Sequence, residues 1–266
     1  MISYPEFSDN CARLEDRVAA AAQSCGRSPS EVKILPVTKF HPLEAVEFAR
    51  RRGFESVGEN RVQEAADKIG KAGFKISWEL IGHLQSNKAG LAVRLFDRIQ
   101  SVDSKKLLEK IDFHARGFGK IQRVLLQINA GNDPAKFGAD LSDGPELLEF
   151  ALGLPNVSVE GLMAIAPIDS TLRAAEECFL SLRNLRDALQ REFSRPLPEL
   201  SMGMSGDLEP AVAAGSTMIR VGTFLFGDRE RCFSKSKICA RGNLPPGRRR
   251  APPRFSPCSA SRSPIP

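Results

Sequence analysis

Two hydrophobic periods alternate along this chain and predict a regular succession of helices and strands. Residues 7–25 repeat apolar side chains at helical spacing, from Phe7 through Leu14 to Val18. Short apolar runs typical of buried strands follow. They are residues 33–38, 54–58, 77–82, 96–101, 122–129, 157–165, 199–202 and 217–222. Helical patterns lie between them, among them residues 42–52, 60–72, 104–117, 145–152 and 170–193.

Eight strands that alternate with helices predict an α/β protein, specifically a (β/α)₈ TIM barrel. The alternative is an open doubly wound sheet. No G-x-G-x-x-G motif follows the first strand, which argues against a dinucleotide-binding version of that sheet. We expect one barrel domain over residues 1–229.

The 266 residues have a net charge of +6, but the charge is unevenly distributed. Residues 230–266 contain nine Lys or Arg and one acid, whereas residues 1–229 contain 29 basic and 31 acidic residues. The tail is rich in Pro, Arg and Ser and has neither hydrophobic period, so we expect disorder there. Its composition changes abruptly, which suggests an altered reading frame; comparing all frames of the encoding DNA would test this.

The cysteines and the apolar runs indicate a cytoplasmic protein. No run approaches the roughly 20 residues of a membrane span, and the first residues lack a signal-peptide pattern. Cys11, Cys25 and Cys178 fall on predicted helices, where we expect reduced and mostly packed thiols. The tail cysteines lack close metal-ligand spacing, so we expect no metal site.

Barrel function gathers where strands end, and Lys39 directly follows the first predicted strand, at the barrel mouth. Low-dielectric surroundings disfavour an ammonium group and favour a free amine that can form a Schiff base with an aldehyde. The alternative is a lysine that extends into water. At the second strand end, Glu59, Asn60 and Arg61 are expected to face the mouth, with helix capping as the alternative for Asn60. His83 lies at the end of the third predicted strand. It is expected either to contact a ligand or to be a structural histidine.

The last two strand ends are small and polar, as in barrel phosphate sites. Ser205 and Gly206 precede a helix that begins at about Asp207, and Gly222 and Thr223 follow the eighth strand. Exposed amides at a helix N-terminus suit a phosphate, although these glycines also suit simple turns.

Strand alternation also assigns Arg220 to the interior of the barrel. A buried guanidinium needs an acceptor, either from a ligand or from a carboxylate. A lysine and a phosphate site together suit a phosphorylated aldehyde, either pyridoxal 5′-phosphate (PLP) or a sugar phosphate.

Five segments in order resemble the PLP homeostasis protein family, single-domain relatives of the alanine racemase N-terminal barrel. They are VTKFHP, FESVGENRVQEAADK, WELIGHLQSNK, VEGLMAIAP and LSMGMSGDLEPAVAAGSTMIRVGTFLFGDR. The family ends soon after the last motif, so the tail has no counterpart in it.

The resemblance implies a fold-type III barrel that holds PLP as an internal aldimine on Lys39. It implies that Ser205, Gly222 and Thr223 hold the phosphate and that Arg220 faces the pyridine nitrogen. The residues that it places around the cofactor are Asn60, His83, Ser201 and Met204. It also implies a carrier or regulator of intracellular PLP and vitamin B6, which passes PLP to PLP-dependent apo-enzymes.

Enzyme alternatives are a PLP-dependent amino-acid racemase or a Schiff-base aldolase. A racemase needs a second base, which alanine-racemase-like enzymes take from a tyrosine of a second domain. We expect no such domain here, and the only tyrosine is Tyr4, before the first predicted helix. A cation beside the pyridine nitrogen also opposes ring protonation and weakens the electron sink. We therefore expect no clear turnover. We also expect a monomer without membrane or nucleic-acid partners, because the basic tail has no groove-reading or aromatic-rich motif.

Overall fold

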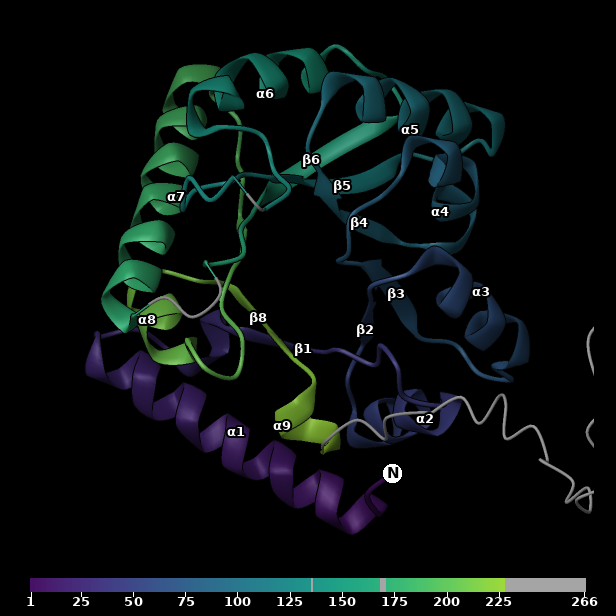
Figure 1. Cartoon of the computed structure of the whole chain (residues 1–266), viewed down its shortest axis with the longest axis vertical. Coiled ribbons are helices and arrows are strands. Elements are labelled where there is room, and N and C mark those ends of the chain that lie inside the picture. The colour runs from purple at the N-terminus through teal and green to yellow at the C-terminus, as the bar shows by residue number, and fades with distance from the viewer. Residues whose placement is uncertain (135, 168–170, 228–266) are drawn as a thin grey trace, which may run out of the picture. The chain divides into compact units, whose positions relative to one another are not determined.

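The chain forms a barrel of eight parallel strands surrounded by helices (Figure 1). A computed structural model describes residues 1–134, 136–167 and 171–227. The strands are β1 (Lys33–Pro36), β2 (Ser56–Glu59), β3 (Ser77–Leu80), β4 (Arg98–Val102), β5 (Gln122–Gln127), β6 (Val157–Met163), β7 (Glu199–Ser201) and β8 (Met218–Val221). Each pairs in parallel with its neighbour in the order β1-β8-β7-β6-β5-β4-β3-β2.

A single bridge brings the two ends of this order together. Val37, just after β1, pairs in parallel with Gly58 of β2. The amide of Thr38 donates to the carbonyl oxygen of Gly58 at 3.0 Å. The predicted (β/α)₈ barrel is therefore confirmed, and the open doubly wound alternative is wrong.

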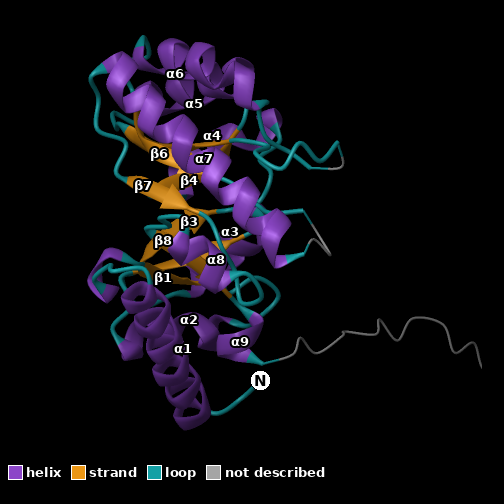
Figure 2. Ribbon diagram, turned by 90° about the vertical axis from the view of Figure 1, so that its left-hand side faces the viewer, coloured by secondary structure: helices purple, strands orange, loops and turns teal. Residues whose placement is uncertain are grey.

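Helices follow the strands and cover the outside of the ring (Figure 2). They are α1 (Tyr4–Ser24), α2 (Leu43–Arg52), α3 (Val62–Lys71), α4 (Ala89–Leu95), α5 (Lys105–Gly117), α6 (Gly144–Leu152), α7 (Leu172–Phe193), α8 (Leu208–Ala213) and α9 (Thr223–Phe226). The first helix begins three residues earlier than its apolar stripe indicated. Ser3 caps it by accepting from the amide of Glu6, and Pro5 suits its first turn.

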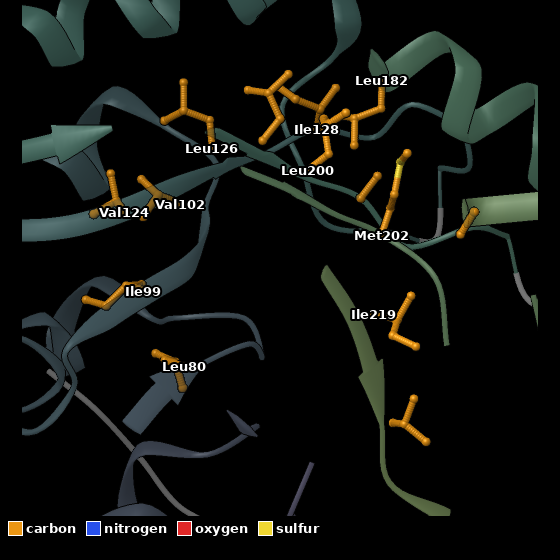
Figure 3. Close-up of a cluster of buried hydrophobic side chains, with 14 of the residues drawn as sticks. Leu80, Ile99, Val102, Val124, Leu126, Ile128, Leu182, Leu200, Met202 and Ile219 are labelled. Carbon is orange, nitrogen blue, oxygen red and sulfur yellow. The ribbon is translucent and has the colours of Figure 1, made fainter. Parts of the chain in front are cut away.

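The main hydrophobic core lies between the strands and the helices. Apolar strand residues such as Ile99, Leu126 and Leu200 point outward and meet helix residues such as Leu182 of α7 (Figure 3). The inward positions of the same strands are largely polar. A small apolar cluster of Leu35, Val37, Ile81 and Met218 is the exception.

The described cysteines divide into buried and exposed thiols. Cys11 and Cys178 are buried, and burial raises their pKa values to about 12 and about 11. Cys25 is exposed and does not pack as its two counterparts do. All three are free thiols.

Two further expectations from the sequence concern membrane-spanning helices and the C-terminal tail. None of the helices within those residues is long and apolar enough to cross a membrane. The chain divides into units Met1–Glu230 and Arg231–Pro266. The tail predicted over residues 230–266 lies outside the described residues.

Replacing Phe7 tests how firmly α1 holds the barrel. Phe7 is fully buried and stacks on Phe226 of α9 with ring centroids 5.0 Å apart. Phe7→Ala is expected to lower the free energy of unfolding by about 3–5 kcal/mol because it leaves a cavity. Urea denaturation measures this, with Phe113→Ala as a control within about 0.5 kcal/mol, since Phe113 is 59% exposed. Equal losses would contradict the packing described.

Candidate functional site

The predicted site residues gather on neighbouring strand ends because of the order of the sheet. Closure of the ring places β2, β1, β8 and β7 side by side. The amide of Val37 donates to the Val221 carbonyl at 2.8 Å, and the amide of Arg220 donates to the Gly203 carbonyl at 3.0 Å. The loops that follow these strands therefore leave the barrel from one edge, at its carboxyl end.

Lys39 lies in a tight turn at the end of the first of these strands. It has the parity of Leu35 and Val37, which belong to the interior cluster, and its side chain is half-buried. The amide of His41 donates to the Thr38 carbonyl at 3.0 Å and closes the turn. Phe40, directly after the lysine, has φ 62°, a left-handed conformation that is costly for a bulky residue.

A buried ion pair behind the barrel wall holds this strained turn. Lys68 of α3 donates from Nζ to Oε1 of Glu59 at 2.6 Å and to the Thr38 carbonyl at 2.8 Å. The Thr38 hydroxyl donates to the same Glu59 oxygen at 2.6 Å. Glu64 accepts from Lys68 at 3.0 Å and from the amide of Phe40.

Glu59 therefore faces away from the mouth, contrary to the prediction. It ends β2 one position after Gly58, and alternation turns it outward toward α3. Its carboxylate is fully buried, and burial raises its pKa, while Lys68 opposes that rise.

Asn60 lies beside the loop that follows β3. A Cβ atom on Gly82 would lie 2.2 Å from the Asn60 carbonyl oxygen, so only glycine allows these segments to approach. The capping alternative for Asn60 is wrong: the N-cap of α3 is Arg61, and no side-chain hydrogen bond caps it. Within the described residues, the Asn60 side chain makes no hydrogen bond.

His83 lies at the mouth against an aromatic ring. It stacks on Phe137 with centroids 3.8 Å apart and planes at 11°. Its Nδ1 lies 3.5 Å from Oδ2 of Asp103. Phe137 comes from the loop after β5 and was not predicted as a neighbour.

The loop after β7 carries Met204 and Ser205 and is held by its own side chains. Gly203 has φ 97°, and a Cβ atom there would lie 2.5 Å from the Cβ of Ala211, so the turn requires glycine. Oδ1 of Asp207 accepts from the amide of Met204. Apart from its two neighbours in sequence, no described residue comes within 4 Å of a Cβ placed on Gly206.

The loop after β8 turns directly into α9. Gly222 is the N-cap of this short helix and Thr223 is its first, exposed residue. The first amides of a helix lack partners inside the helix. Arg17 of α1 links both loops, since it donates to the Ser205 carbonyl at 3.4 Å and lies 5.5 Å from the Phe224 ring centroid.

Arg220 is buried inside the barrel below these loops. Its Nη1 donates to the Ser201 carbonyl and hydroxyl oxygens, each at 2.7 Å, and its Nη2 donates to the Ala164 carbonyl at 2.8 Å. Burial lowers its pKa to about 10, with Asp207 opposing this, so the guanidinium is charged at neutral pH. Three of its five donors are used, and the other two make no hydrogen bond within the described chain.

These groups suit a small anion with a reactive carbonyl. A lysine, two loops with exposed amides and hydroxyls, and a buried guanidinium with spare donors lie at one end of the barrel. Among the described residues, no group of three or more His, Cys, Asp or Glu could hold a metal ion. The donor set therefore fits the phosphorylated aldehyde inferred from the sequence.

Sequence reasoning missed the residues that support the site from behind. The i,i+4 spacing of Glu64 and Lys68 was visible in the chain, but their contact with Thr38 depends on how α3 packs. Arg17 lies far from the β7 loop in sequence, so only tertiary structure reveals their contact.

Family and sequence comparisons agree with this geometry. Residues 10–230 match the family model of the alanine racemase N-terminal domain. The pyridoxal phosphate homeostasis protein of Aquifex aeolicus is 38% identical over 223 residues, covering 84% of this chain and 98% of that protein. The Escherichia coli K12 protein of the same name is 36% identical over 231 residues, covering 85% and 97%.

Solved structures extend the comparison to a protein with its cofactor. PipY of Synechococcus elongatus, solved with PLP bound, is 37% identical with a TM-score of 0.73, covering 83% of this chain and all of that one. A Bifidobacterium adolescentis protein is 34% identical with a TM-score of 0.79, covering 85% and 98%. An alanine racemase of Clostridium difficile, at 15% identity, TM-score 0.65 and coverage of 80% and 56%, shares the fold alone.

The Lys68–Glu59 pair predicts a large effect of removing the lysine. Lys68→Met is expected to lower the free energy of unfolding by about 3–5 kcal/mol, because it leaves a buried carboxylate without a partner. The pKa of Glu59, already raised, rises further without Lys68. A raised folded pKa means that stability is lost as pH rises through it, so the deficit grows from acidic to neutral pH. Denaturation at both pH values measures this.

Two further variants sharpen that measurement. Lys68→Met combined with Glu59→Gln removes the charge with its partner and should recover much of the loss. Arg173→Met breaks an exposed pair with Glu177 and should cost at most about 1 kcal/mol. A Lys68→Met deficit no larger than that of Arg173→Met would show that the buried pair does not hold the turn.

Proposed function

This chain belongs to the pyridoxal phosphate homeostasis protein family, and on that premise we propose that it binds PLP at the barrel mouth. We propose that it holds the cofactor for intracellular vitamin B6 homeostasis rather than turning over a substrate. The observation that carries the proposal is the position of Lys39 in the turn after β1, because β1 pairs with the strand that carries Arg220 and leads into Thr223.

Lys39 is the residue that we assign to the covalent attachment. When bound, PLP supplies an aldehyde that condenses reversibly with a primary amine. The strained turn at Phe40 and the ion pair behind it hold the lysine at the strand end.

We assign the phosphate to the loops after β7 and β8. Ser205 and Thr223 offer hydroxyl groups, and Gly222 brings the main chain close. Arg17 contacts both loops from outside, and its charge is paired with Glu209 of α8 at 2.7 Å. We assign Asn60, His83, Ser201 and Met204 to the surroundings of the cofactor.

Arg220 supports the proposal that the protein is not an enzyme. Its guanidinium is charged at neutral pH, and we propose that its spare donors face the pyridine nitrogen. A permanent cation there favours the unprotonated ring, which stabilises negative charge on a bound amino acid poorly. The site then favours holding the cofactor over α-carbon chemistry.

The only tyrosine of the chain is engaged elsewhere, which disfavours a racemase. Tyr4 of α1 meets Phe48 of α2 with ring centroids 5.4 Å apart. The guanidinium carbon of Arg51 lies 3.8 Å from its ring centroid. Tyr4 thus belongs to the packing between two outer helices, and we assign it no role as a second base.

We further propose a cytoplasmic monomer that delivers PLP to PLP-dependent apo-enzymes. The described thiols are all free, which is consistent with a reducing compartment. Nucleic acid is not a proposed partner, because the whole excess of positive charge lies in residues 230–266, outside the barrel domain.

Removing Lys39 tests the proposed attachment. The purified protein mixed with PLP should show the visible absorbance of a lysine-bound cofactor, and borohydride should fix the label on Lys39. Lys39→Ala should lose both signals, because it removes the amine that forms the covalent bond. Spectroscopy and peptide mapping measure the outcome.

Lys106→Ala provides the matched control, because it removes an exposed lysine of α5 by the same substitution. It should keep the spectrum and the label. A label that remains on another lysine in Lys39→Ala, at the wild-type level, would sink the assignment. Robust turnover of an amino acid by the wild-type protein would favour the racemase alternative.

A further inference from the structure

A chain of hydrogen bonds crosses the barrel interior and ends at Arg220. It starts at the ion pair of Arg98 and Glu79, with Arg98 Nε to Glu79 Oε2 at 2.7 Å and Nη2 to Oε1 at 3.1 Å. Gln100 Nε2 donates to Glu79 Oε2 at 2.7 Å. The Ser201 hydroxyl donates to Gln100 Oε1 at 2.6 Å and accepts from Arg220.

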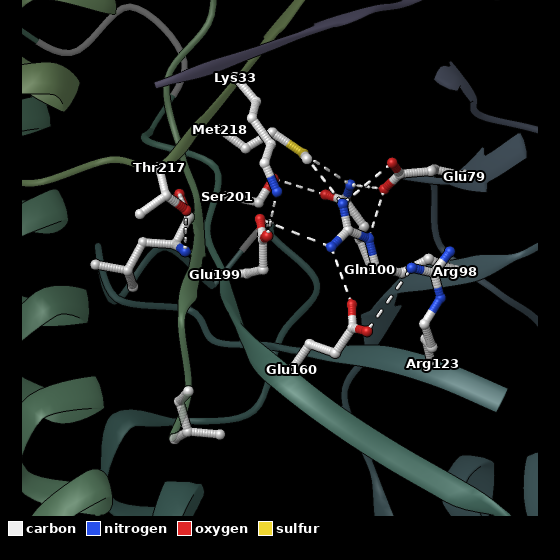
Figure 4. Close-up of polar contacts among 12 residues, drawn as sticks. Lys33, Glu79, Arg98, Gln100, Arg123, Glu160, Glu199, Ser201, Thr217 and Met218 are labelled. Atoms are coloured by element: carbon white, nitrogen blue, oxygen red, sulfur yellow. Dashed lines mark hydrogen bonds and ion pairs between the residues drawn. The ribbon is translucent and has the colours of Figure 1, made fainter. Parts of the chain in front are cut away.

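The members of this chain come from four strands and are all deeply buried. Glu79 lies on β3, Arg98 and Gln100 on β4, Ser201 on β7 and Arg220 on β8. None is more than 5% exposed. Figure 4 shows Gln100 between the Arg98–Glu79 pair on one side and Ser201 on the other. The connection therefore spans the interior between opposite walls of the barrel.

The donor and acceptor in each of these hydrogen bonds follow from the negative charge of Glu79. The Glu79 carboxylate only accepts, so the neighbouring Gln100 group must be the NH₂. Met218 Sδ, at 3.3 Å from the same nitrogen, is also an acceptor. The Gln100 oxygen then faces Ser201, whose hydroxyl must donate to it. The free lone pairs of that hydroxyl are consequently directed to Arg220.

We infer that Glu79 and Gln100 are positioning residues for Arg220, and through it for the ring of PLP. Glu79 and Gln100 make no hydrogen bond to the guanidinium of Arg220, and neither is among the residues proposed to surround the cofactor. They act by keeping the Ser201 hydroxyl an acceptor toward Arg220, which fixes the plane and spare donors of the guanidinium. This inference rests on the proposed function, in which those donors face the pyridine nitrogen.

Loss of the Glu79 charge removes the constraint. A neutral amide at position 79 accepts or donates, so the Gln100 amide can turn over and offer its NH₂ to Ser201. Ser201 would then accept from Gln100 with one of its two lone pairs, and its hydroxyl hydrogen would lose the acceptor that turns it away from Arg220. The guanidinium would keep the carbonyls of Ser201 and Ala164, but the hydroxyl of Ser201 would no longer be held as its third acceptor.

The structure offers a matched control on the same arginine. Glu160 accepts from Arg98 Nη1 at 3.0 Å but makes no contact with Gln100 within the described chain. Glu160→Gln and Glu79→Gln are thus the same substitution at two carboxylates of one cation. Only Glu79 belongs to the connection that reaches Arg220.

The test compares PLP binding and thermal melting of the full chain. Glu79→Gln and Gln100→Met are expected to raise the dissociation constant for PLP about tenfold, the loss typical of a hydrogen bond to a charged group. Glu160→Gln is expected to bind like the wild type. The visible spectrum of the bound cofactor should change in the first two variants and not in the third. Gln100→Met preserves the length of the side chain and keeps the test informative if Glu79→Gln folds poorly.

A double variant separates positioning from general support of the barrel. If Gln100 acts through Ser201, adding Gln100→Met to Ser201→Ala should change binding no further. Additive effects, equal weakening by Glu160→Gln, or unchanged binding in both Glu79→Gln and Gln100→Met would overturn the inference. A wild-type protein that does not bind PLP on Lys39 would instead overturn the proposed function, so the two failures are distinguishable.

Discussion

Arg220 places a positive charge inside a closed barrel, and the polar interior is organised around it. A buried guanidinium without acceptors is strongly unfavourable, so the interior must supply oxygens that point at it. Ser201 and Ala164 supply three, and burial leaves the pKa at about 10, high enough to keep the charge at neutral pH. Further hydrogen bonds connect Ser201 to the other buried polar groups. Ser201 donates to Gln100, Gln100 donates to Glu79, and Glu79 also accepts from Arg98.

This arrangement divides the strands into two faces with different tasks. Outward residues such as Ile99 and Leu200 pack against the helices and supply most of the hydrophobic stabilisation (Figure 3). Inward neighbours such as Gln100 and Ser201 fix the orientation of hydrogen bonds more than they stabilise the fold. The hydrogen bonds of buried polar groups roughly offset the cost of removing those groups from water. A substitution on one face therefore reports on folding and a substitution on the other reports on the site.

The sequence predicted the barrel and its strand ends because both depend on local period. Alternation alone placed Arg220 inside, and long motifs indicated the family to which the chain belongs. Glu59 was misassigned because one step of parity separates the mouth from the outer wall. The Gln100 connection was not predicted, although Arg98 and Gln100 lie on either side of the apolar Ile99 in β4. Its partners depend on the register of β3 and β7 across the barrel.

The Lys68–Glu59 pair and the interior hydrogen bonds to Arg220 fix different parts of the proposed site. The pair of Lys68 and Glu59 lies outside the barrel wall and fixes the main chain at Thr38. It therefore determines the main-chain position from which the Lys39 side chain extends. The interior chain fixes a side chain, because it determines how Arg220 is turned. Within the proposed function, one network positions the covalent attachment and the other positions the charge beside the ring. A carrier needs both geometries to be stable before the cofactor arrives, since ordering them on binding would weaken affinity.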